Sequence, residues 1–359
     1  MRELEYNFTY REKDKGFQVI LSYKDSKGRW KQKSKQGFKT KKLAKIAGDK
    51  LLDQVKEKAS TEVDESLAGI TLKQLETLFL QENAYVLEYN TQASYHSALR
   101  AFKDIAAMPI NEIKYTHIIN CLNTMAFAES TKSTYLAKIK RLLNYAVSPC
   151  KIIRFNPASE VPTPKDKRKK KIRTVSMEEF KSILAFAHDS NHTIYVKLAI
   201  AGYAGLRYGE IAALKWDAIN LVDLELTVNS QLAAVGKNKY AIKTTKSVNS
   251  YRTIPIPPEL AAILSEYRRI VPTRIDLRLF DDKTTSTFLV NRAIRDSGYA
   301  LSIHDLRHTY ATRLLANGVD IKTVAALLGD TVQTVINTYI HYSDEMRAKA
   351  KTDIIKIFA

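Results

Sequence analysis

A dense run of positive charge near the middle of the chain limits how the chain can fold. Residues 165–173 carry seven basic side chains and one acid, and they follow Pro157, Pro162 and Pro164. Like charges at this density repel one another and do not pack into a core, and proline continues neither a helix nor a central strand. The chain therefore divides here, at a segment that is either a solvated linker or a flexible strap that follows a polyanion.

A second polar and unpatterned stretch lies near the N-terminus, at residues 61–69. A chain of 359 residues, of which 45% are apolar, is long enough for about two to three domains. The two polar segments therefore predict three domains. We expect them at residues 1–60, 70–156 and 174–359, with linkers at 61–69 and 157–173.

The first of these domains is unusually basic. Residues 11–50 hold 14 Lys and Arg against four Asp and Glu. Alternating apolar residues at 17–23 predict a strand, residues 29–33 predict its return strand, and an i, i+4 apolar pattern from Leu43 to Val55 predicts a helix. This pattern indicates a small α+β domain, whose lysines either solvate it or contact a polyanion. The candidate contacts on the return strand are Arg29, Lys31 and Lys33.

The second and third domains differ in pattern. From Ile70 to about residue 149, apolar residues recur at helical spacing between turn signals, which predicts four or five short helices. Beyond Thr174 the pattern is mixed, with a capping box at Ser176 and Glu179. We expect β-like runs at 224–228, 240–243 and 252–256, and helices near 192–204, 258–271, 284–297, 304–317, 323–328 and 331–339.

Charge and cysteine content narrow the function classes. The 57 Lys and Arg exceed the 38 Asp and Glu, for a formal net charge of +19, which favours a polyanionic partner. The two cysteines, Cys121 and Cys150, form no CxxC pair, so a disulfide framework and a structural zinc site are not expected. No apolar run reaches membrane-spanning length. We expect a soluble, cytoplasmic protein that binds no membrane.

Four features of the last domain carry candidate chemistry. The segment Gly205-Leu206-Arg207-Tyr208-Gly209-Glu210 places an arginine between glycines at a helix start, which suits close contact with a phosphate. His304 and Arg307, three residues apart, share one helix face and reach one anion together. Lys246 lies on a turn between strands, and Tyr339 follows the Gly329-Asp330 segment. Each feature is weak evidence when taken alone.

In this order and spacing, the four features resemble the tyrosine recombinase, or phage integrase, family. The preceding helical domain, with Asn156-Pro157-Ala158 at its end, is similar to the core-type DNA-binding domain of that family. The basic N-terminal domain is similar to the arm-binding domain of integrases from temperate phages and integrative elements. The resemblance implies a multidomain fold: a small α+β arm-binding domain, an all-α, SAM-like core-binding domain, and a mainly-α catalytic domain with a small β-sheet.

The resemblance also implies a mechanism. Tyr339 attacks the scissile phosphodiester and gives a 3′-phosphotyrosyl link, while Arg207 and Arg307 bind the non-bridging oxygens. Lys246 protonates the 5′-oxygen leaving group, and His304 assists as a proton carrier or hydrogen-bond donor. The resemblance implies neither a cofactor nor a metal ion. Two further residues are expected to support the site: Glu210 and His308.

One position departs from the family pattern. Asp330 stands where the family usually has His or Trp, and an ionised carboxylate cannot donate a hydrogen bond to phosphate. Asp330 either accepts a hydrogen bond from Tyr339 or Lys246, or is protonated, or leaves the role to His308 or His341. Two assignments have rivals, because Tyr342 competes with Tyr339 as nucleophile and Lys243 competes with Lys246 as acid.

The implied partner is double-stranded DNA, bound at core sites and at arm sites by a homotetramer, with DNA-bending and directionality factors. Linker lysines are candidate DNA contacts: Lys167, Lys169 and Lys171. The apolar tail at 343–359 docks either on its own domain or on a neighbouring protomer. The favoured interpretation is a site-specific integrase. A catalytically silent DNA-binding repressor or architectural protein is the alternative, and the basic N-terminal domain counts against a chromosome-dimer resolvase.

Overall fold

The computed structural model describes residues 5–13, 16–24, 29–61, 67, 69–166, 172–244, 251–281 and 286–339. The chain divides into two compact units, Met1–Lys167 and Arg168–Ala359. Several residues singled out in the sequence lie outside the described ranges: Lys167, Lys169, Lys171, Lys246, His341, Tyr342 and the tail at 343–359.

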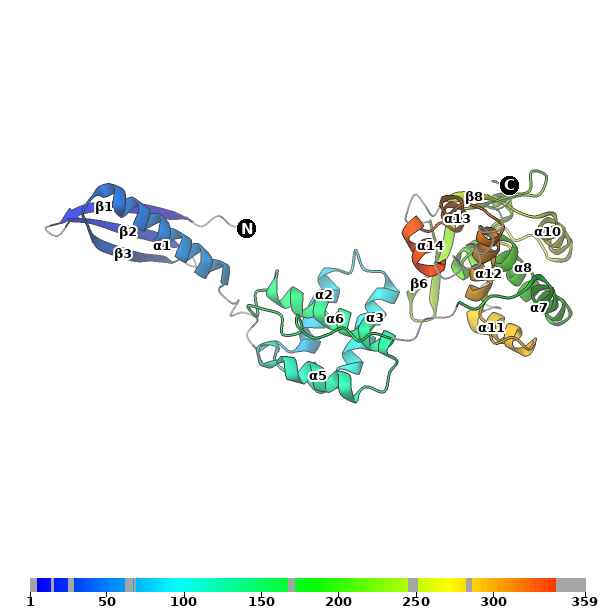
Figure 1. Cartoon of the computed structure of the whole chain (residues 1–359), viewed down its shortest axis with the longest axis horizontal. Helices are drawn as coiled ribbons and strands as arrows, with labels where there is room; N and C mark the ends of the chain where they lie inside the picture. Colours follow the sequence, from blue (N-terminus) through cyan, green and yellow to red (C-terminus); the bar gives the residue numbers. More distant parts are fainter. Residues whose placement is uncertain are drawn as a thin grey trace, which may run out of the picture. The chain divides into compact units, whose positions relative to one another are not determined.

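The N-terminal part of the first unit is a sheet covered by one helix (Figure 1). Strands β1 (Tyr6–Lys13), β2 (Gly16–Lys24) and β3 (Trp30–Phe38) form an antiparallel sheet in the order β1-β2-β3, and α1 (Lys41–Thr61) packs against β2 and β3. Val19 and Leu21 are fully buried against Leu51 and Val55 of the helix. The predicted α+β fold is therefore confirmed, while strand β1 is an addition that the alternation at 17–23 did not predict.

The residues from Leu72 to Val147 form an all-α arrangement with its own apolar core, as expected. Thr71 and Gln74 form a capping box at the start of its first helix. The elements are α2 (Leu72–Glu82), α3 (Tyr89–Ala101), α4 (Lys103–Ala106), the 3-10 helix η2 (Ile110–Glu112), α5 (Tyr115–Thr124) and α6 (Glu129–Val147).

The segment after α6 stays attached to these helices. The Asn156 side chain donates hydrogen bonds to the Lys140 carbonyl oxygen and to Asn144 Oδ1, at 3.0 and 2.7 Å. Ala158 and Val161 are buried in the same core. Contacts of the helical part therefore continue beyond Asn156 as far as Val161.

The second unit is mainly α-helical and is built around α8, whose residues are buried on nearly all sides. Helices α7, α10 and α12 pack around α8 (Figure 1). The helices are α7 (Met177–Ser190), α8 (His192–Ala204), α9 (Tyr208–Ala213), η3 (Trp216–Ala218), α10 (Pro258–Ile270), α11 (Thr287–Asp296), α12 (Ile303–Ala316), α13 (Ile321–Leu328) and α14 (Val332–Tyr339).

Two small sheets complete this unit. Strands β4 (Ile219–Asn220), β5 (Glu225–Val228) and β8 (Arg252–Pro255) form one antiparallel sheet, and β6 (Ser230–Gly236) and β7 (Lys239–Thr244) form a hairpin. The expected mainly-α domain with a small sheet is confirmed. None of the helices in the described ranges combines the length and hydrophobicity needed to cross a bilayer.

Candidate active site

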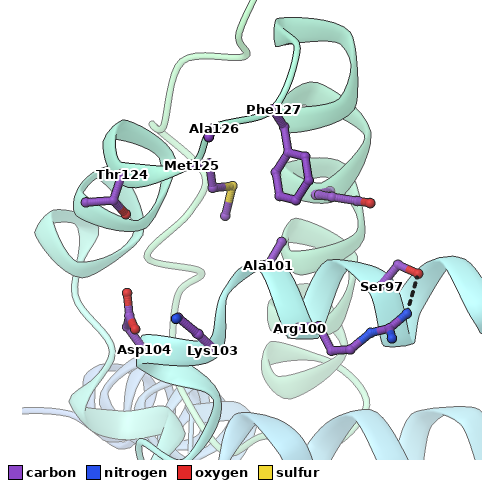
Figure 2. Close-up of a pocket in the computed structure, with 10 residues that line it drawn as sticks. Ser97, Arg100, Ala101, Lys103, Asp104, Thr124, Met125, Ala126 and Phe127 are labelled. Atoms are coloured by element: carbon purple, nitrogen blue, oxygen red, sulfur yellow. Dashed lines mark hydrogen bonds between the residues drawn. The ribbon is translucent and has the colours of Figure 1, made fainter.

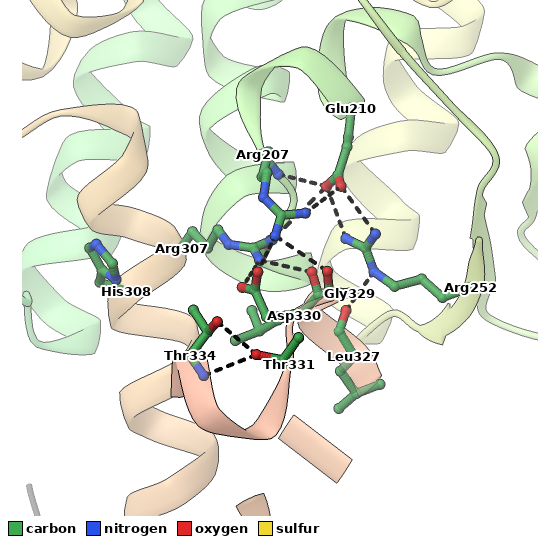
Figure 3. Close-up of polar contacts among 12 residues, drawn as sticks. Arg207, Glu210, Arg252, Arg307, His308, Leu327, Gly329, Asp330, Thr331 and Thr334 are labelled. Carbon is green, nitrogen blue, oxygen red and sulfur yellow. Dashed lines mark hydrogen bonds and ion pairs between the residues drawn. The ribbon is translucent and has the colours of Figure 1, made fainter. Parts of the chain in front are cut away.

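Two arginines from distant parts of the chain meet at one carboxylate (Figure 3). Arg207, the residue before α9, donates through Nη2 to Oδ1 of Asp330, which follows α13. Arg307 of α12 donates through Nη2 to Oδ2 of Asp330 at 2.6 Å. The predicted arginine pair is therefore brought together, and its shared partner is an anion. The sequence had not suggested this ion pair.

Arg307 is held by the backbone as well as by Asp330. Its Nη1 donates to the Gly205 carbonyl oxygen at 2.7 Å, and its Nη2 donates to the Leu328 carbonyl oxygen at 2.8 Å. Its side chain is only 3% exposed. These contacts fix the guanidinium plane, so little reorganisation is needed when an anion binds there.

Glu210 orients Arg207 from the opposite side. Its buried carboxylate accepts hydrogen bonds from the Arg207 amide at 2.8 Å and from Arg207 Nη1 at 2.9 Å. Burial alone raises the pKa of Glu210, but hydrogen bonds and charges from Arg252 and Arg207 outweigh burial and lower this pKa below its ordinary value. Glu210 is therefore ionised and acts as a fixed anchor for Arg207.

Arg252 is a residue of this cluster that the sequence analysis missed. It lies buried on β8, donates from Nη1 and Nη2 to Glu210 at 3.1 and 2.9 Å, and donates from Nε to the Leu327 carbonyl oxygen at 2.7 Å. Arg252 thus links the start of α9 to the end of α13. One pattern in the sequence could have revealed Arg252. It alternates with Ile254 and Ile256 on the buried face of a strand, and a cation on a buried face requires a partner.

The glycines of the Arg207 segment have a structural role in packing. Gly205 ends α8 in the left-handed region, with φ 67°, and a Cβ there would overlap the Tyr310 ring. At Gly209 a Cβ would lie 3.0 Å from the Leu232 carbonyl oxygen on β6. The glycines therefore allow close packing that places Arg207.

Tyr339 is linked to α12 through a histidine. Its hydroxyl lies 2.8 Å from Nδ1 of His308, and the tyrosine is only 6% exposed. The His304 and His308 rings stand edge to face, with centroids 4.6 Å apart. His304, Arg307 and His308 share α12, so the expected helix-face arrangement connects the tyrosine to the arginine pair.

Both histidines are shifted toward their neutral forms. Loss of hydration, followed by the positive charges of Arg307 and Arg207, lowers the pKa of His304. Burial and the nearby His304 lower the pKa of His308. A neutral His308 has one ring nitrogen with a free lone pair, which can accept the hydrogen bond of the Tyr339 hydroxyl.

The remaining predicted residues that the structure describes belong to other elements. Lys243, the alternative acid, is partly buried on β7, whereas Lys246 lies outside the described ranges. Arg29, directly before β3, and Lys31 on β3 are exposed, and Lys33 on the same strand is partly buried. These three belong to the first unit.

The helical part of the first unit has a cavity of its own (Figure 2). It measures about 590 Å³, and Arg100, Lys103, Asp104 and Phe127 are among the residues that line it. Arg100 donates a hydrogen bond to Ser97 Oγ at 3.2 Å. The lining holds two cations and one acid but no nucleophile paired with a base, so we assign no chemistry to this cavity.

Comparison with known proteins gives two family matches. Residues 173–346 match the description "Phage integrase family", and residues 8–55 match "Arm DNA-binding domain". A tyrosine recombinase XerC-like protein of Caldanaerobacter subterraneus subsp. tengcongensis is 28% identical over 292 residues, covering 71% of this chain and 74% of that protein. The ICEBs1 integrase of Bacillus subtilis is 27% identical over 207 residues, covering 53% of this chain and 56% of that protein.

Solved structures show the same fold. The Tn1549 transposon integrase bound to transposon right-end DNA covers 79% of this chain and 99% of its own, at 19% identity and TM-score 0.67. A lambda integrase dimer bound to a core site covers 92% of this chain and 93% of its own, at 17% identity and TM-score 0.59. A lambda integrase tetramer bound to a Holliday junction covers 90% of this chain and 95% of its own, at 16% identity and TM-score 0.57.

Proposed function

Because the chain belongs to the phage integrase family of tyrosine recombinases and carries an arm DNA-binding domain, we propose that it integrates and excises a mobile element by site-specific recombination. The observation that supports this best is the pair formed by Arg207 and Arg307, which converge on one anion beside the histidines of α12. One of its relatives is the ICEBs1 integrase of Bacillus subtilis.

In the proposed reaction, the Tyr339 oxygen attacks the scissile phosphorus. A P–O bond forms to the tyrosine, and its hydroxyl proton passes to Nδ1 of the neutral His308. The bond to the 5′-oxygen breaks at the same time, and Lys246 donates a proton to that oxygen. Arg207 and Arg307 stabilise the charge on the non-bridging oxygens. Attack by the 5′-hydroxyl of another strand then reverses the step and releases Tyr339, so no bond energy is lost.

Other residues hold these groups in position. Glu210 fixes Arg207, His304 donates to the phosphate, and His308 holds the Tyr339 hydroxyl. Because Asp330 and the phosphate are both anionic, the phosphate takes the place of the carboxylate between the arginines, and Asp330 moves aside as DNA binds.

The other parts of the chain supply the DNA contacts. We assign arm sites to residues 1–60, through Arg29, Lys31 and Lys33, and core sites to residues 70–156 and 174–359. Beyond Val161, the linker follows the phosphate backbone through Lys167, Lys169 and Lys171. Because lambda integrase forms a tetramer on a Holliday junction, the active assembly proposed here is also a tetramer. It acts on chromosomal DNA in the cytoplasm, together with bending and directionality factors.

A nicked suicide substrate tests this function. Wild-type protein is incubated with a library of candidate attachment sites, and covalent adducts are separated on a denaturing gel. We expect an adduct that Tyr339→Phe abolishes without loss of DNA binding. An adduct that persists in Tyr339→Phe but disappears in Tyr342→Phe would move the nucleophile to Tyr342.

One observation favours a second candidate, a DNA-binding protein without catalysis. Asp330 fills the place between the two arginines, where a phosphate must bind for cleavage. Specific DNA binding without an adduct on any nicked site, both for the wild type and for Asp330→His, would favour this second candidate.

A further inference from the structure

A cluster of potential ligand atoms lies on the second unit, apart from the arginine pair. His188 is in the last turn of α7, His192 is the first residue of α8, and Glu266 belongs to α10. One nitrogen from each histidine and one oxygen of the carboxylate all lie within 4.8 Å of one another. Arg207 follows the other end of α8, and a helix of this length spans about 20 Å.

The hydrogen bonds of the two histidines leave suitable lone pairs free. His188 Nδ1 lies 3.2 Å from Oδ1 of Asp189, and His192 Nδ1 lies 3.2 Å from the His188 carbonyl oxygen. Both partners accept hydrogen bonds, so each Nδ1 carries the proton and each Nε2 keeps its lone pair. Metal-binding histidines are oriented in this way, by a carboxylate or carbonyl on the nitrogen that does not bind the metal.

The two rings are also held in place. Their centroids lie 4.6 Å apart, and Tyr195 packs edge-on against His188 with centroids 5.1 Å apart. His188 and His192 are half-buried, while Glu266 is exposed. The ligands from α7 and α8 are therefore ordered before a cation arrives, and the exposed Glu266 side chain can complete the set.

A cavity beside His188 leaves room for further ligands. It measures about 380 Å³, and its lining includes His188, Asp189, Tyr195 and Tyr203. Three protein ligands with an open position are typical of zinc sites that also bind water or a small anion. Two imidazoles and one carboxylate bind Zn²⁺ in preference to Mg²⁺ or Ca²⁺.

We propose that His188, His192 and Glu266 bind one Zn²⁺ ion, which joins α7, α8 and α10 at the end of α8 far from Arg207. Ordinary Zn–ligand distances of about 2.0–2.2 Å require the three ligand atoms to move closer together, and small side-chain rotations achieve this. The proposed recombination chemistry does not use this ion. Bound zinc stabilises the folded unit, because zinc binds the folded site more tightly than the unfolded chain.

Calorimetric titration of the untagged, full-length, metal-free protein with ZnCl₂ tests this proposal. We expect one saturable equivalent in the wild type and in the control His117→Asn, which alters a histidine of α5. We expect this zinc binding to disappear in the double variant His188→Ala/His192→Ala, and its affinity to fall in Glu266→Gln. Asp189→Ala, which removes the hydrogen-bond partner of His188 and a carboxylate from the cavity lining, weakens binding about tenfold.

The pair His304 and His308 gives a built-in comparison, because these rings also stand 4.6 Å apart. Zinc binding that disappears in His304→Asn/His308→Asn and persists in His188→Ala/His192→Ala overturns the proposal, as does the absence of any saturable equivalent in the wild type.

Circular dichroism and the metal-free melting temperature show whether each variant folds. Should His188→Ala/His192→Ala not fold, Asp189→Ala and Glu266→Gln decide the matter, and unchanged zinc affinity in both overturns the proposal. Co²⁺ gives a second measurement, because imidazole-bound Co²⁺ absorbs visible light. We expect this absorption in the wild type and its loss with the His188 and His192 side chains.

Discussion

Nη2 of Arg307 donates a hydrogen bond to Oδ2 of Asp330 at 2.6 Å, although the arginine side chain is only 3% exposed. A buried guanidinium needs a compensating anion, and Asp330 supplies it in the structure. The same position between Arg207 and Arg307 suits a phosphate. The carboxylate therefore both stabilises the folded protein and competes with DNA for the arginine pair.

Replacing Asp330 with asparagine separates these two effects. In Asp330→Asn we expect the free energy of unfolding to fall by about 1–3 kcal/mol, because Arg207 and Arg307 lose a charged partner. Core-site DNA should bind about tenfold more tightly, because no negative charge opposes the phosphate. Urea denaturation and gel-shift titration at fixed salt measure the two quantities. Unchanged DNA affinity would show that Asp330 does not compete with the phosphate.

Arg252 gives a prediction about a residue that positions others without touching DNA. In Arg252→Leu, Glu210 loses two hydrogen bonds, its pKa rises, and Arg207 loses a fixed anchor. We expect adduct formation to fall at least tenfold and stability to fall by about 3 kcal/mol, as for other broken buried ion pairs. Affinity for core-site DNA should change much less.

The matched control for Arg252 is Arg292→Leu, because Arg292 is 63% exposed and pairs with Asp296 on the surface of α11. Exposed pairs contribute about 0–1 kcal/mol, so its stability should stay near that of the wild type. Arg252→Lys should recover part of the activity, since a lysine restores the charge but not the bidentate contact. Equal losses in Arg252→Leu and Arg292→Leu would refute the positioning role.

The contact between His308 and Tyr339 predicts energetic coupling between them. Tyr339→Phe and His308→Asn each remove a hydrogen bond worth about 1 kcal/mol. The double variant should therefore be less destabilised than the two single variants added together, by about 0.5–1.5 kcal/mol. Additive losses would show that the hydrogen bond does not form in solution.

The same histidines make stability depend on pH. The pKa values of His304 and His308 lie below the ordinary value of 6.5 in the folded protein. Between these lowered pKa values and pH 6.5, the unfolded chain therefore binds more protons than the folded protein. The contribution of the two histidines to the free energy of unfolding is complete above about pH 6.5 and is lost as the pH falls toward the lowered values. Replacing both histidines with asparagine should flatten this dependence.

Fluorescence of Trp216 can follow unfolding of the second unit alone. The chain has two tryptophans; Trp216 is buried near α9, and Trp30 lies on β3 of the first unit. A Trp30→Phe background removes the signal of the first unit. Urea transitions between pH 5 and 7.5 then give the pH dependence, and stability that rises on acidification would contradict the assigned shifts.

Local patterns in the sequence predicted much of this fold for physical reasons. Alternation at 17–23 marked a half-buried strand, and Ser176 with Glu179 marked a helix start, because both signals depend on neighbouring residues only. The spacing of His304 and Arg307 placed them on one face of α12 for the same reason. The ion pair of Asp330 with Arg207 joins residues 123 positions apart, so no local pattern could reveal it.

The basic strand β3 gives a final prediction about arm-site binding. Arg29, Lys31 and Lys33 are each expected to neutralise one phosphate of arm-type DNA. Replacing all three with alanine should therefore reduce the slope of log affinity against log salt concentration by about 3, since each contact contributes about 0.9.

The matched control replaces Lys41, Lys42 and Lys45 of α1, which removes the same charge from the helix. Those three are exposed, as are Arg29 and Lys31, so net charge alone would reduce both slopes equally. Because DNA bound on the strand contacts only the first set, we expect the strand variant to lose far more of the slope, and both variants to keep the slope for core-type DNA. Equal slopes for the strand and helix variants on arm-type DNA would rule out β3 as the recognition strand.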